Sequence, residues 1–128
     1  MNPVPKTLGL DFGVRRIGVA VSQSSLVEPL VTLINSPQVM DQILALCGQH
    51  GIRQIVAGVS EGISARRTHD FITKLKSVTQ LPIFTTDETL STKEARAKLK
   101  EAGRRIKPGE PVDHYAAALI LESWLVDL

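Results

Sequence analysis

Acidic residues stand at the ends of three apolar segments of the chain. Asp11 follows the apolar residues 8–10, the Asp87-Glu88 pair follows residues 82–86, and Asp113 opens a segment rich in alanine and leucine. Singly, such acids are typical of turns and helix caps, but three of them favour one shared site. Carboxylate oxygens suit Mg²⁺ or Mn²⁺, and two such ions can activate a water and stabilise the leaving oxygen of a phosphodiester. The pattern predicts a metal-dependent phosphodiesterase centre.

The spacing of apolar residues in the last segment indicates where the carboxylate of Asp113 points. Asp113 precedes the apolar positions 116, 117, 120 and 124 by helical intervals, which places its carboxylate on the buried face of a helix. A carboxylate in that position needs a partner, although a plain helix cap is the alternative. Strand alternation sends Asp87 and Glu88 to opposite faces, so only one of the two can point at a shared site.

Positive charge is concentrated near the C-terminal end. The net charge is +2, yet residues 93–107 hold seven Lys or Arg and two acids. This strip is either a solvated helix face or a surface for phosphates. On the second interpretation the chain binds nucleic acid through a set of basic side chains: Arg15, Arg16, Arg66, Lys93, Arg96, Lys100, Arg104 and Arg105.

Motifs of other mechanisms are missing from the sequence. There is no GxxxxGK[ST] loop, no GxSxG and no HExxH, and we expect His114 to lie at the surface or to support the site rather than to act in catalysis. The single Cys47 favours a reducing, cytoplasmic location. No apolar run is long enough to span a bilayer, so no membrane partner is expected.

The segments between these residues predict one α/β domain over residues 1–128. Alternating or apolar runs bounded by Gly, Asn and Pro predict strands at 7–10, 17–22, 30–34, 54–59 and 82–86. Helical spacing predicts helices at 39–46, closed by Gly51, at 65–78, from the capping box 91–94, and after Pro111, with a loop at 103–109. The order predicts a three-strand meander followed by parallel crossovers.

Four segments of the chain resemble one family. They are Leu8-Gly9-Leu10-Asp11-Phe12-Gly13 with Arg16-Ile17-Gly18-Val19-Ala20, Ile55-Val56-Ala57-Gly58, Asp87-Glu88-Thr89-Leu90-Ser91-Thr92 with Glu94-Ala95, and Asp113-His114-Tyr115-Ala116-Ala117. In order and spacing they are similar to the YqgF/RuvX family. The chain differs from that family's usual pattern at Thr89 and in the loop 59–64.

The resemblance implies an RNase H-like fold, a five-stranded mixed sheet (a three-strand antiparallel meander plus two parallel strands) flanked by helices. It also implies a nuclease that processes the 5' end of pre-16S ribosomal RNA, with Asp11, Glu88 and Asp113 as its catalytic and metal-binding acids. In this fold the first and fifth strands flank the fourth, so their ends lie about 9.6 Å apart. We expect Glu88 to reach inward, with Glu61 or Asp87 as alternatives.

Other functions remain open at this stage. The partner is structured RNA or branched DNA, because the resemblance also implies cleavage of Holliday junctions, and the chain is a monomer or a homodimer. A non-catalytic RNA-binding factor of ribosome assembly is a second class. A nucleotide-binding ATPase half is a third, ranked last because such enzymes enclose the nucleotide between two lobes.

Overall fold

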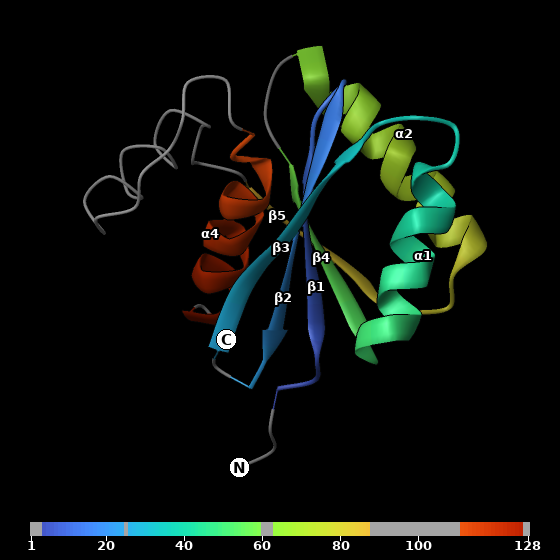
Figure 1. The fold of residues 1–128 in the computed structure, drawn as a ribbon. Helices are drawn as coiled ribbons and strands as arrows, with labels where there is room; N and C mark the ends of the chain where they lie inside the picture. Colours follow the sequence, from blue (N-terminus) through green and yellow to red (C-terminus); the bar gives the residue numbers. More distant parts are fainter. Residues whose placement is uncertain (1–3, 25, 60–62, 88–110, 127–128) are drawn as a thin grey trace.

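A five-stranded mixed sheet lies at the centre of the fold (Figure 1). The computed structural model describes residues 4–24, 26–59, 63–87 and 111–126. The strands are β1 (Thr7–Phe12), β2 (Arg16–Gln23), β3 (Leu26–Ile34), β4 (Gln54–Val59) and β5 (Ile83–Asp87). Their order is β3-β2-β1-β4-β5: the first three are antiparallel neighbours, and β4 and β5 run parallel to β1. The predicted fold class is confirmed.

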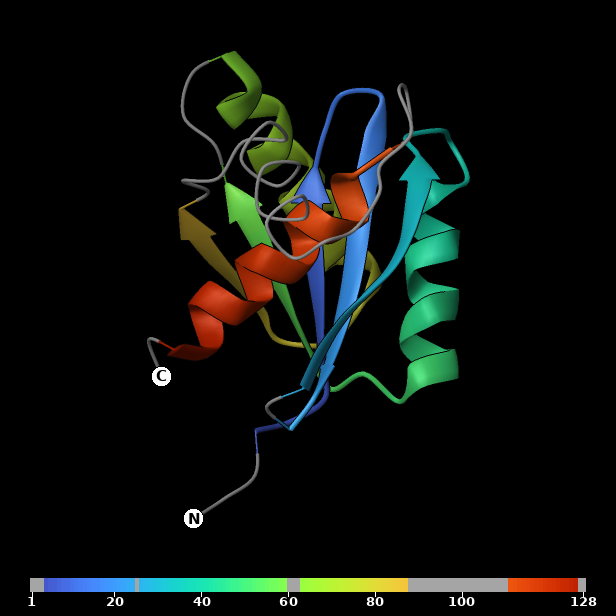
Figure 2. The same ribbon diagram turned by 60° about the vertical axis from the view of Figure 1, so that its left-hand side comes forward.

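Helices cover both faces of this sheet. Helices α1 (Val39–His50) and α2 (Ile63–Val78) lie on one face, and α4 (Asp113–Val126) lies across the other (Figures 1 and 2). Gly51 ends α1 in a left-handed conformation, φ 63°, as the sequence predicts. The predicted helix from 91 and the loop at 103–109 fall outside the described residues.

Large aliphatic side chains fill the face under α1 and α2. Phe12 of β1 packs against Phe71 of α2, with ring centroids 4.9 Å apart. Burial raises the pKa of the Cys47 thiol to about 11, so this thiol is a packing residue rather than a nucleophile. The fully buried side chains in this cluster include Leu8, Leu10, Ile17, Val19, Ile43, Ile55 and Leu75.

Small residues line the opposite face, under α4. A Cβ on Gly9 would overlap the Leu121 side chain, and a Cβ on Gly58 would lie 2.5 Å from Cδ1 of Ile120. These glycines therefore let α4 approach the strands more closely than any side chain would allow. Ala20 and Ala117 complete the thin apolar layer between them.

Several element boundaries differ from the prediction, and those of the third and first strands matter for the sheet. The third strand begins at Leu26 rather than at residue 30, and it includes Pro29. Proline is tolerated there because β3 is an edge strand, and the register shifts opposite Val19 and Ala20. The first strand continues through Asp11 to Phe12, so Asp11 lies inside the sheet instead of just beyond it.

Candidate metal centre

Asp11 lies between two glycines of the sheet. Its register partners are Gly18 on β2 and Gly58 on β4. Directly paired residues point to the same face, so Asp11 shares the α4 face with both glycines. The residue is only 8% exposed. A buried carboxylate is therefore held at a point where both neighbouring positions lack a side chain.

Asp113 reaches the same point from the last helix. It is the first residue of α4, and a Cβ on Gly18 would overlap its backbone carbonyl. Since Gly18 is also the partner of Asp11, the first turn of α4 sits directly beside Asp11. Two of the three predicted acids, 102 positions apart in the sequence, therefore meet at one end of the α4 face. Their catalytic role stays a prediction.

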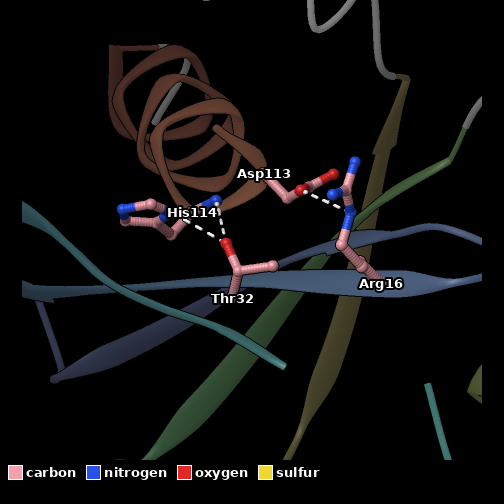
Figure 3. Close-up of polar contacts among 4 residues, drawn as sticks. All are labelled: Arg16, Thr32, Asp113 and His114. Atoms are coloured by element: carbon pink, nitrogen blue, oxygen red, sulfur yellow. Dashed lines mark hydrogen bonds and ion pairs between the residues drawn. The ribbon is translucent and has the colours of Figure 1, made fainter. Parts of the chain in front are cut away.

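The Asp113 carboxylate makes an ion pair with Arg16. Its Oδ2 lies 3.2 Å from Nε of Arg16, and the Asp113 side chain is 14% exposed (Figure 3). Oδ2 is itself buried and has no hydrogen-bond partner among the residues described. The predicted partner of this core-facing carboxylate is thus a half-exposed arginine, and one oxygen keeps unused capacity as a ligand.

Thr32 fixes the first turn of α4 from a neighbouring strand. Its Oγ1 accepts a hydrogen bond from the backbone N–H of His114, at 3.3 Å, and lies 2.8 Å from Nδ1 of the same histidine (Figure 3). Amides of a first helical turn lack partners within the helix, so Thr32 serves as an N-cap supplied by β3. His114 is half-buried and its ring stacks on Tyr115, with centroids 4.2 Å apart. His114 is thus held between β3 and Tyr115, and its supporting role stays a prediction.

Asn35 fixes the turn between β1 and β2. Its Nδ2 donates to the carbonyls of Gly13, at 3.0 Å, and Val14, at 3.2 Å, and its backbone N–H donates to the carbonyl of Arg15 at 2.8 Å. Sequence reasoning missed both Asn35 and Thr32. Their role depends on strand pairing, and neither residue carries a motif that would mark it.

The predicted phosphate-binding side chains are only partly placed. Arg15 and Arg16 are exposed at the β1–β2 turn, beside the two acids. Arg66 is exposed near the start of α2, which follows β4 and so begins at the edge where β1 and β4 end. The other five predicted cations lie outside the described residues: Lys93, Arg96, Lys100, Arg104 and Arg105.

The third acid is not placed by the structure. Glu88 and Glu61 lie outside the described residues, and so do Thr89 and residues 60–62 of the loop that departs from the family pattern. Asp87 ends β5 in register with Val59. The order β1-β4-β5 confirms that the first and fifth strands flank the fourth. Among the residues that are described, no three His, Cys, Asp or Glu side chains form a metal-binding group.

One hollow lies away from these acids. It has a volume of about 430 Å³ and lies between β3 and α1, lined by residues that include Leu30, Gln42, Leu46 and His50. It is therefore on the face opposite α4. None of the helices in the described part of the chain has the length and apolar character needed to cross a membrane.

Comparison with known proteins agrees with the geometry. A family model described as "RuvX: Holliday junction resolvase" matches residues 5–127. Three similar proteins carry the name "Putative pre-16S rRNA nuclease". That of Chloroflexus aggregans is 34% identical over 92% of this chain and 91% of its own length. That of Synechococcus sp. is 36% identical over 96% of this chain and 90% of its own length. That of Legionella pneumophila is 38% identical over 92% of this chain and 93% of its own length.

Solved structures share the fold at low sequence identity. Thermus thermophilus RuvC, in complex with a Holliday junction substrate, superposes with a TM-score of 0.62 at 13% identity, covering 97% of this chain and 96% of that one. The fowlpox virus Holliday junction resolvase superposes with a TM-score of 0.60 at 11% identity, covering 96% and 99%. These similarities establish the fold that carries the two acids.

Proposed function

The chain belongs to the RuvX family, and we propose that it is a metal-dependent nuclease that hydrolyses phosphodiesters of structured nucleic acid, with Asp11, Glu88 and Asp113 as its metal-binding acids. The observation that carries the proposal is the meeting of Asp11 and Asp113 beside Gly18. A divalent cation bound here would offset the repulsion between two carboxylates brought to the same face of the sheet.

The residues present fit a hard divalent cation. Oδ2 of Asp113 is buried and accepts no hydrogen bond within the described structure, so it retains a lone pair for a ligand. Asp11 supplies a second buried carboxylate on the same face. Oxygen-only donors of this kind suit Mg²⁺ or Mn²⁺. When bound, such ions neutralise phosphate charge and polarise the scissile bond.

Glu88 completes the set in this proposal. Thr86 is in register with Gly58, which is in register with Asp11, so Thr86 faces the same side as Asp11. Glu88 is the second residue after Thr86 in the sequence. The family resemblance implies it as the third acid, and we propose that its carboxylate joins those of Asp11 and Asp113 at the metal.

Substrate binding rests on charge in this proposal. Arg15 and Arg66 are exposed at the edge where β1 and β4 end, and they would hold phosphates on either side of the acids. The natural substrate is the 5' end of pre-16S ribosomal RNA, as the names of the relatives indicate. We place the activity in the cytoplasm, where such precursors are processed and a lone Cys47 stays reduced.

A four-way DNA junction is the second candidate substrate. The description of the matching family favours it. A junction cleaver needs two sites in a symmetric arrangement, so this alternative requires a homodimer, whereas trimming of an RNA end can be carried out by a monomer.

A cleavage panel tests both substrates and the chemistry. Wild type, Asp11→Asn and the control Asp41→Asn, an exposed acid on α1, are incubated with a 5'-extended 16S precursor and with a four-way junction, in Mg²⁺, Mn²⁺ or EDTA. We expect metal-dependent cleavage of the RNA that falls at least about a hundredfold in Asp11→Asn and is unchanged in Asp41→Asn.

Each other outcome has a definite meaning. Equal cleavage by Asp11→Asn and wild type would remove Asp11 from the mechanism. Preferential cleavage of the junction would identify four-way junction DNA, rather than the RNA precursor, as the substrate. Salt-sensitive RNA binding without cleavage by any variant would identify a non-catalytic assembly factor instead.

A further inference from the structure

Arg16 and a bound metal ion would compete for the same oxygen atom, Oδ2 of Asp113. Oδ2 of Asp113 is the atom that accepts no hydrogen bond in the described structure, and it is also the atom that Nε of Arg16 approaches at 3.2 Å. The carboxylate is 14% exposed, so its charge requires a counter-charge before any metal arrives. Arg16 provides that charge.

The surroundings of Arg16 allow its side chain to move while its backbone stays in place. The side chain is 49% exposed. The backbone begins β2 in register with Ile34, and the preceding turn is held by the hydrogen bonds from Asn35. Figure 3 shows the Arg16 side chain rising from β2 toward Asp113 at the start of α4.

We propose that Arg16 is a placeholder for the metal: it neutralises Asp113 in the metal-free protein, and its guanidinium passes to a substrate phosphate once Asp113 binds a cation. This inference rests on the proposed function, because it assigns the order of events at the same site. A guanidinium suits both partners, since carboxylate and phosphate offer the same planar pair of acceptor oxygens.

The first test measures metal binding without nucleic acid. Mn²⁺ is titrated into wild type, Arg16→Gln and Asp113→Asn, and free Mn²⁺ is followed by electron paramagnetic resonance. If Arg16 competes with the metal, Arg16→Gln binds Mn²⁺ about three- to tenfold more tightly than wild type. Asp113→Asn binds it more weakly than either.

Arg15 provides the matched control. It is the preceding residue, carries the same charge and is also exposed, but its side chain has no ion pair in the described structure. Arg15→Gln removes the same charge from the same turn. We expect its Mn²⁺ affinity to change less than about twofold. If Arg15→Gln and Arg16→Gln raise the Mn²⁺ affinity equally, the cause is the loss of one positive charge near the site. That outcome would overturn the placeholder role.

Thermal unfolding gives a second readout that does not depend on activity. Without metal, Arg16→Gln leaves a buried carboxylate unpaired, so its Tm falls below that of wild type. Saturating Mn²⁺ then raises the Tm of the variant by more than it raises that of wild type, because binding energy adds to the stability of the folded state. An equal rise in both proteins would contradict the competition.

The second step is tested by RNA binding with and without a cation. A fluorescent RNA precursor is titrated in EDTA or in Ca²⁺, and a denaturing gel verifies that the RNA stays intact. We expect wild type and Arg16→Gln to bind within about twofold of each other in EDTA, and Arg16→Gln to bind about three- to tenfold more weakly in Ca²⁺. An Arg16→Gln loss of the same size in both conditions would show that Arg16 does not switch partners.

The outcomes separate this inference from the proposed function. If wild type binds no Mn²⁺, both are overturned. If wild type and Arg16→Gln bind Mn²⁺ equally and Asp113→Asn binds it weakly, the metal centre stands and the placeholder role is wrong. Weaker binding by Arg16→Gln than by wild type would instead make Arg16 a residue that orients Asp113 for the metal.

Discussion

The two faces of the sheet are packed by opposite rules. Under α1 and α2, large side chains such as Leu10 and Ile43 fill a thick core. Under α4, glycines at the contact points bring helix backbone onto strand backbone. The first arrangement buries much apolar surface and so stabilises the fold, whereas the second fixes the position of the first turn of α4, and with it Asp113, against Asp11. Stability and site geometry are thus separated between the faces.

The largest effect is expected from a cavity on the α1 and α2 face. Leu75 of α2 is fully buried, and Leu75→Ala should lower the free energy of unfolding by about 2–5 kcal/mol. The acids lie on the other face, so cleavage at a temperature where the variant is still folded should stay within about twofold of wild type. Urea unfolding measures the stability and a cleavage assay measures the activity. A large loss of cleavage by the folded variant would contradict the separation of stability and site geometry between the two faces.

Gly18→Ala should show the reverse pattern. The added Cβ would overlap the carbonyl of Asp113, and backbone atoms cannot move aside cheaply. We expect a loss of about 1–3 kcal/mol in stability from overpacking, and a loss of about a hundredfold in cleavage because the first turn of α4 is displaced.

Gly48 supplies the control for that substitution. It lies within α1 with nothing near its Cβ position, so Gly48→Ala should stabilise the protein by about 0.5–1 kcal/mol and leave cleavage unchanged. If Gly18→Ala keeps wild-type cleavage, close contact between α4 and β2 is not what positions Asp113.

Thr32→Val should have the smallest effect. The isosteric change removes the acceptor for the His114 backbone N–H, and the loss of a helix cap costs about 0.5–2 kcal/mol. Cleavage should fall several-fold, since the freed turn carries Asp113. Thr73→Val is the matched control, because the Thr73 hydroxyl only bonds the carbonyl of His69 on the exposed side of α2. If Thr32→Val loses no more cleavage activity than Thr73→Val, the Thr32 cap does not help to position Asp113.

Local patterns in the sequence were enough for most elements. The periods of apolar residues predicted all five strands and both helices of the first face, and Gly51 marked the end of α1. These features depend on neighbours a few positions apart, so they can be seen in one stretch of chain. The edge position of β3 is not visible in this way. For that reason the sequence predicts a strand from residue 30 only, whereas β3 begins at Leu26 and continues through Pro29.

The sequence alone determined which residues could do chemistry: acids at the ends of apolar segments, with arginines beside one of them. Tertiary structure decided how they are paired, because Arg16 meets Asp113 across 97 positions and Thr32 caps His114 across 82. Such contacts arise only when α4 docks on β2 and β3, and their energies depend on distance and burial in three dimensions. No local pattern encodes a distance between residues that the fold alone brings together.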